Sequence, residues 1–163
     1  GSRVARFHTT PTIKQETVGH HTSLVAGILL LVWPEKVTVE LLHYAIFHDS
    51  AEFITGDVPS PAKRLMDRTA LDDLETRVME SHGIRLIKLT EDQRKIFKFA
   101  DNLAGLATCV FELRMGNLHA LEAANNFTEY FKQSYDPLVD DPRAWEAYLS
   151  IVECLNAHFD QPT

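Results

Sequence analysis

The feature that most constrains the fold is a long amphipathic stretch that begins at residues 90–93, TEDQ. A Thr followed three residues later by Gln is typical of a capping box, which starts an α-helix. Apolar residues then recur every three or four positions, as on one face of a helix: Ile96, Phe99, Leu103, Leu106, Val110 and Leu113. Gly116 follows, and glycine commonly lies just past a helix end. The sequence therefore predicts a helix from about 91 to 115, with one face that other elements must cover.

The remaining chain shows the same helical periodicity and no alternating pattern of a β-strand. The predicted helices are residues 17–31, 38–55, 65–82, 118–134 and 142–159. Together with the helix at 91–115 they predict an all-α fold, a compact bundle of about six helices.

Individual helices carry further expectations. In the first, His21 shares the apolar face of Val18 and Val25, so it should face the core, whereas His20 points away. The second is apolar nearly all round, which is typical of a central, buried helix. In the last helix the residues expected to face inward are Trp145, Leu149, Val152 and Leu155.

Composition limits the classes of protein. The 163 residues fit one domain, residues 3–163, with 1–2 resembling a cloning scar. A net charge of -7 argues against nucleic-acid binding, and no apolar run approaches the ~20 residues that span a membrane. Cys109 and Cys154 lie at apolar helical positions without metal-ligand spacing. They are expected to be buried thiols of a reducing, cytoplasmic compartment.

Ionisable side chains interrupt the apolar run at residues 44–53, YAIFHDSAEF. On a helix His48, Asp49 and Glu52 reach one small volume, and burying them is costly unless a partner such as a divalent cation compensates. A cation that activates water needs nitrogen and oxygen ligands with open positions. His21 and Asp101, from two other helices, complete a set of two imidazoles and two carboxylates. Such a set admits Co, Mn, Zn, Fe or Ni.

The pattern H…HD…D resembles the HD-domain phosphohydrolases, most closely the small 5'-deoxynucleotidases and the phage dATP triphosphohydrolases. Residues 48–52, HDSAE, are similar to the family's HDxxE, and residues 55–63, TGDVPSPAK, to its TGDxPxPxK. Residues 100–103, ADNL, resemble its ADKL, with Asn102 in place of Lys. Two departures leave substrate choice open: His20 replaces an acidic residue, and Phe7, after Arg6, replaces a Trp found in several relatives.

The resemblance implies an HD domain and a role for each motif residue. His21, His48, Asp49 and Asp101 would bind one divalent metal ion, with Asp49 also part of the catalytic centre. Glu52 would act as a general acid/base or position water. The residues implied to bind a deoxynucleotide are Arg6 and Lys63 for phosphate, Asp57 for the 3'-hydroxyl, and Phe7 and Pro61 for the base and the sugar 2' position.

Alternatives remain open at this point. Each of these residues taken alone is more often structural or solvated, and Arg64 rivals Lys63 as a phosphate contact.

Removal of the 5'-phosphate from deoxynucleoside monophosphates is preferred, because few Lys or Arg lie near the motifs. The alternative is a dATP-preferring triphosphohydrolase. A catalytically silent nucleotide-binding module and a two-iron redox enzyme are further possibilities. The aromatic residues of the last two helices, and the resemblance, predict a homo-oligomer.

Overall fold

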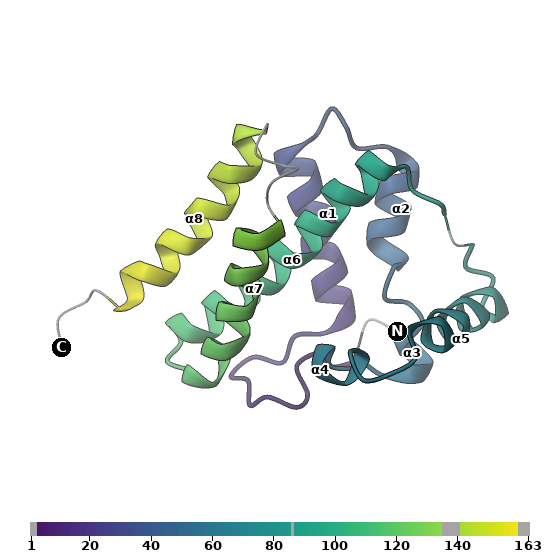
Figure 1. Ribbon diagram of the computed structural model, residues 1–163, viewed down its shortest axis with the longest axis horizontal. Helices are drawn as coiled ribbons and strands as arrows, with labels where there is room; N and C mark the ends of the chain where they lie inside the picture. The colour runs from purple at the N-terminus through teal and green to yellow at the C-terminus, as the bar shows by residue number, and fades with distance from the viewer. Residues whose placement is uncertain (1–2, 86, 135–140, 160–163) are drawn as a thin grey trace.

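The computed structural model describes residues 3–85, 87–134 and 141–159. These residues form six helices of nine or more residues, two single-turn α-helices and one 3-10 helix (Figure 1). The α-helices are α1 (Val18–Val32), α2 (Val39–Phe47), α3 (Glu52–Thr55), α4 (Ser60–Lys63), α5 (Arg68–Ser81), α6 (Glu91–Arg114), α7 (Leu121–Ser134) and α8 (Pro142–Phe159), and a 3-10 helix, η1, spans Leu118–Ala120. In the described ranges no strand forms; one isolated bridge pairs Ala5 with Thr17. The predicted all-α fold is confirmed.

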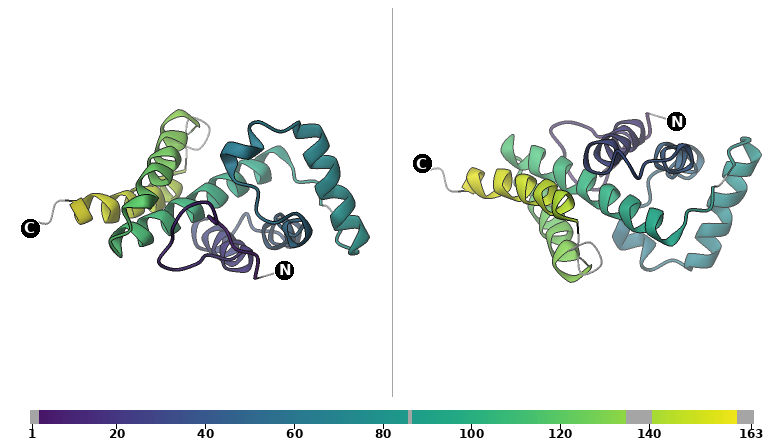
Figure 2. Two further views of the ribbon diagram at one scale, coloured as in Figure 1. Left: turned by 90° about the horizontal axis from the view of Figure 1, so that it is seen from below. Right: turned by 90° about the horizontal axis from the view of Figure 1, so that it is seen from above.

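Helix α6 is the central element (Figure 1). The predicted capping box forms at Thr90 and Gln93, and the predicted apolar face is buried. This helix packs against α1 and α2 on one side and against η1, α7 and α8 on another. The views along the other axis place α5 at one end of the molecule and the end of α8 at the opposite end (Figure 2). A continuous core therefore surrounds α6.

The predicted second helix is wrong in two respects. It is not continuous over 38–55, because α2 ends at Phe47 and residues 48–51 form turns before α3. It is not the central buried helix either: only Leu41 and Ala45 of α2 are buried, while Val39 is 80% exposed. Uniform apolarity did not identify the central element; the longer helix with a one-sided apolar face takes that place.

The C-terminal helices also differ from expectation. Leu149 and Val152 of α8 pack against the core as predicted. Trp145 is 42% exposed, however, and Ala144 and Tyr148 are buried, so the most buried positions lie about one residue from the predicted ones. The side chain of Leu155 lies outside the described residues. Phe131 and Tyr148 pack together in the core, so these two aromatic residues serve folding, and the predicted homo-oligomer stays a prediction.

The two cysteines have different surroundings. Cys109 is buried as predicted, but Cys154 is exposed, which corrects the expectation for that residue. Every helix in the described part of the chain is too short or too polar to cross a lipid bilayer.

Candidate metal centre

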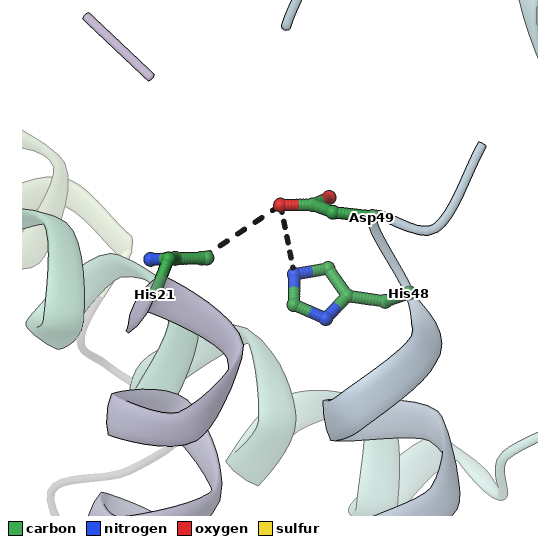
Figure 3. A group of neighbouring side chains, drawn as sticks. All are labelled: His21, His48 and Asp49. Atoms are coloured by element: carbon green, nitrogen blue, oxygen red, sulfur yellow. Dashed lines mark ion pairs between the residues drawn. The ribbon is translucent and has the colours of Figure 1, made fainter. Parts of the chain in front are cut away.

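Two segments that are far apart in the sequence bring three of the predicted ligands together (Figure 3). His21 projects from α1, and His48 and Asp49 follow the last turn of α2. The Asp49 Oδ2 atom lies 3.3 Å from His48 Nε2 and 3.9 Å from His21 Nε2. One potential ligand atom from each of the three residues lies within 4.8 Å of the others. This spacing suits a single cation bound between them.

Asp101 of α6 lies beside the same group. Its Oδ1 atom is 3.0 Å from His21 Nε2 and 3.8 Å from His48 Nε2. The interruption of the helix after Phe47 turns His48 and Asp49 toward α1 and α6. All four predicted ligands therefore converge, although the fourth contacts mainly the two histidines.

The ring of His48 is oriented for metal binding. Its Nδ1 atom lies 2.9 Å from the carbonyl oxygen of Ala45, which fixes Nδ1 as the protonated nitrogen of a neutral ring. The Nε2 atom, which faces the carboxylates, is buried and has no hydrogen-bond partner among the described residues. A buried nitrogen without a partner is costly, and a cation bound at Nε2 removes that cost. The donor set therefore fits a divalent metal ion.

Electrostatics keep both carboxylates of the centre ionised. Burial alone would raise the pKa of Asp49, but His48, when it is protonated in the metal-free chain, and the guanidinium of Arg6 hold that pKa well below its usual range. Burial likewise opposes ionisation of Asp101, yet hydrogen bonding to His21 and the charge of Lys98 keep its pKa far below the ordinary value. The centre thus presents two negative charges, as a divalent cation requires.

Glu52 has a different environment. It begins α3, its side chain is buried, and its Oε2 atom has no hydrogen-bond partner in the described chain. The Nζ atom of Lys63 lies 3.5 Å from Oε1. Burial, together with the neighbouring charges of Asp49 and Asp57, raises the pKa of Glu52 to about 8. Two nearby carboxylic acids with pKa values pushed apart, here Glu52 and Asp49, are typical of acid–base catalysis.

Arg6 links the N-terminal segment to the ligands. Its Nη1 atom lies 2.7 Å from Asp49 Oδ2, and its Nε atom lies 3.2 Å from Oε2 of Glu16. Glu16 is 3% exposed and also accepts a hydrogen bond of 2.6 Å from the hydroxyl of Thr108. No sequence pattern indicates that Glu16 is buried, because it is a single Glu at the end of an irregular segment.

Asp57 and Phe7, which the resemblance assigns to substrate binding, lie next to each other. The backbone N–H of Phe7 donates to Asp57 Oδ2 over 3.2 Å. Phe7 has a positive φ of 54°, a conformation that costs a bulky residue free energy and that this contact helps to hold. The backbone of Pro61 lies in α4, but its side chain is outside the described residues.

Lys98 is a second charged residue that sequence analysis missed. Its Nζ atom lies 2.8 Å from Asp101 Oδ2, and Asp101 raises the pKa of the lysine although burial alone would lower it. The signal was present in the sequence, because residues three apart on a helix are neighbours. Lys98 and His48 also line a cavity of about 460 Å³ between α2, α5 and α6.

Comparison with proteins of known function agrees with this geometry. The chain matches no protein-family model. It is 36% identical over 84 residues to a dATP triphosphohydrolase of Acinetobacter phage SH-Ab 15497, a match that spans 40% of this chain and 41% of that protein. It is 23% identical over 170 residues to the 5'-deoxynucleotidase of Cronobacter sakazakii, which covers 84% of this chain and 81% of the relative.

A solved structure extends the likeness to the whole fold. The HD phosphohydrolase DatZ of cyanophage S-2L, bound to dA and one catalytic Zn²⁺ ion, superposes with a TM-score of 0.68 and 19% identity. The match covers 98% of this chain and 93% of that one. The resemblance to the HD-domain phosphohydrolases is confirmed. His48 and Asp49, which form the HD motif of this chain, supply two of the three potential ligand atoms that lie within 4.8 Å of one another.

Proposed function

We propose that the protein is a metal-dependent phosphohydrolase that cleaves the 5'-phosphate ester of 2'-deoxynucleotides. The observation that carries the proposal is the convergence of His21, His48, Asp49 and Asp101 around one small volume. A divalent metal ion held by these residues would lower the pKa of water and polarise a phosphoryl oxygen. Relatives named for phosphohydrolase reactions on deoxynucleotides support the substrate class.

The chain's own residues supply the remaining chemistry. Arg6, already paired with Asp49, is positioned to donate to phosphate oxygens at the same centre. Glu52 is protonated at neutral pH, because its pKa is about 8, and can give a proton to the leaving 5'-oxygen. Lys63, 3.5 Å from Glu52, adds positive charge beside the transferred group.

The sugar would lie on the side of the centre formed by Phe7 and Asp57. One Asp57 oxygen holds the backbone of Phe7, which leaves the carboxylate an acceptor for a 3'-hydroxyl. The Phe7 side chain packs partly into the core and is held close to the centre by its neighbour Arg6. A bulky ring at the sugar would disfavour a 2'-hydroxyl and so select deoxyribose.

The number of phosphates that leave together distinguishes two candidate reactions. The monophosphate reaction was preferred because few basic residues lie near the motifs in the sequence. The structure removes that reason, since Arg68, Arg85, Arg94 and Lys98 line the cavity beside His48. This observation favours the second candidate, release of triphosphate from a deoxynucleoside triphosphate.

A substrate panel tests the proposal. The protein is incubated with Co²⁺ or Mn²⁺ and each deoxynucleoside mono- and triphosphate, with ribonucleotides in parallel, and phosphate is separated from triphosphate by ion-exchange chromatography. We expect turnover of deoxynucleotides only, abolished in Asp49→Ala. Asp73→Ala, which removes an exposed carboxylate of α5, should keep full turnover. Full activity in Asp49→Ala, or none on any deoxynucleotide with any divalent metal, overturns the proposal.

A further inference from the structure

The cavity beside the metal centre carries more positive charge than a single phosphate requires. We propose that its α6 wall is a subsite for the phosphates beyond the first, so that the substrate is a deoxynucleoside polyphosphate. This inference rests on the proposed function, because it assumes that the first phosphate lies at His48 and Asp49. The residues of the subsite, Arg85, Arg94 and Lys98, lie outside all the motifs that carry the family resemblance.

The cavity adjoins the candidate centre at one of the candidate ligands, His48. His48 forms part of its lining, and Tyr44 and Phe97 form the adjoining wall. The ring centroids of Tyr44 and Phe97 lie 6.4 Å and 4.9 Å from the ring centroid of His48. The opposite wall is one face of α5, at the end of the molecule seen in Figure 2. A volume of about 460 Å³ is within the range of small-molecule sites. The space is therefore large enough for a phosphate chain that extends from the metal.

The charge of the lining is opposite in sign to the charge of the whole chain. Four cationic side chains, Arg68, Arg85, Arg94 and Lys98, face two carboxylates, Asp72 and Glu75, although the protein carries a net charge of -7. The guanidinium groups of the three arginines form no ion pair or side-chain hydrogen bond with any described residue. Guanidinium groups without partners, gathered at one cavity, are suited to bidentate binding of phosphate oxygens.

The cations on α6 are ordered by their distance from the metal centre. Lys98 contacts Asp101 at 2.8 Å, so its charge lies next to the ligands. Arg94 lies four residues earlier, one turn further along the same face of α6. Arg85 follows the end of α5 and reaches the cavity from the connection between α5 and α6. Lys98 and Arg94 thus lead away from the site of the first phosphate along α6, and Arg85 adds a third positive charge to the same cavity.

The two carboxylates define which wall the phosphates follow. Asp72 and Glu75 both belong to α5, where they lie three residues apart on the face that lines the cavity. Their charge repels phosphate from that wall and leaves the α6 wall as the favourable one. Arg68 lies at the start of α5, four residues before Asp72, and is therefore not assigned to the subsite.

Binding of inorganic tripolyphosphate tests the subsite without any turnover. The full chain, as purified, is titrated by calorimetry with sodium tripolyphosphate and separately with orthophosphate. We expect tripolyphosphate to bind at least about tenfold more tightly, which corresponds to about 1.4 kcal/mol. Arg94→Gln and Arg85→Gln should each remove most of that preference and leave orthophosphate binding unchanged. Lys95→Gln, an exposed neighbour on α6 that does not line the cavity, is the matched control and should behave as wild type.

The same variants in the hydrolysis assay separate the two proposals. Arg94→Gln should lower kcat/KM for deoxynucleoside triphosphates about tenfold more than for monophosphates. Equal affinity for tripolyphosphate and orthophosphate, or the same loss in Arg94→Gln and Lys95→Gln, overturns the subsite even if monophosphates are hydrolysed. Arginine-dependent tripolyphosphate binding without hydrolysis of any deoxynucleotide supports the subsite and refutes the proposed reaction instead.

Discussion

The buried carboxylate of Glu112 offers a sharp test of how the N-terminal segment is held. Glu112 is 2% exposed on α6 and accepts the backbone N–H of Ile13 at 2.7 Å and that of Lys14 at 2.9 Å. The side-chain amide of Asn117 donates to the same carboxylate over 2.7 Å. Because this segment continues back to Arg6, Glu112 indirectly positions a residue of the candidate centre.

The substitution Glu112→Gln keeps the shape but replaces one acceptor oxygen with an N–H donor. One backbone N–H then faces a donor and loses its bond, and hydrogen bonds to a charged group contribute about 1.5–3 kcal/mol each. We therefore expect the free energy of unfolding to fall by about 2–3 kcal/mol. For a chain of this size the melting temperature should fall by about 5–10 °C. Urea and thermal unfolding followed by circular dichroism measure both quantities.

The pH dependence gives the same test a second readout. Burial alone would raise the pKa of Glu112, but the hydrogen bonds from Asn117, Ile13 and Lys14 lower it below the ordinary value. The stabilisation is therefore complete above the unfolded pKa of about 4.3 and is lost as the pH falls through the lower folded pKa. Glu153→Gln, an exposed carboxylate of α8, is the control. Equal stability of the two variants at pH 7, or a difference that persists unchanged at pH 3, would refute the reasoning.

Three further predictions concern packing, acid–base behaviour and metal binding. Gly105→Ala places a Cβ atom against the Phe127 ring and should cost about 1–3 kcal/mol in urea unfolding. Gly27→Ala, in open space on α1, should instead stabilise by about 0.5–1 kcal/mol. Equal effects of the two substitutions would contradict the close approach of α6 and α7. In chelator-treated protein, the pKa of Glu52 is raised to about 8, so between about pH 4.3 and 8 the folded state binds more protons than the unfolded state. The free energy of unfolding should therefore fall as the pH rises through that interval and level off above it. A Glu52→Gln variant whose stability shows the same pH dependence as wild type would disprove this. Removal of the metal ion with a chelator should lower the melting temperature of the wild-type protein but not that of Asp49→Ala, as measured by differential scanning calorimetry. An equal decrease in melting temperature in both proteins would show that the metal binds elsewhere.

The fold was predictable where helix signals were local. The capping box at 90–93 and the apolar face of the following helix specify α6 by themselves, and α1 follows from the spacing of Val18, His21 and Val25. The break after Phe47 was not predictable, because residues 48–51 have no Gly or Pro and α2 ends for tertiary reasons. The one-residue shift in α8 has a similar origin: packing on α6 buries Tyr148 rather than Trp145.

The candidate site was predictable to the extent that its residues occur in motifs. His48 and Asp49 are adjacent in sequence, and the family resemblance identified His21 and Asp101 at a distance. Burial of Glu16 depends on how the N-terminal segment packs beside Thr108 of α6. The cluster of Arg85, Arg94 and Lys98 depends on how α5 and α6 approach each other. No pattern in the sequence encodes that approach, so the charge of the cavity became visible only in the folded chain.

Cobalt binding tests the central claim most directly. Metal-free protein is titrated with Co²⁺ while its visible absorption and the hydrolysis of deoxynucleotides are followed together. The convergence of His21, His48, Asp49 and Asp101 predicts one Co²⁺ ion per chain, activity that rises in proportion to its binding, and loss of both signals in Asp49→Ala and His21→Ala. Unchanged Co²⁺ spectra and stoichiometry in those two variants would contradict the account.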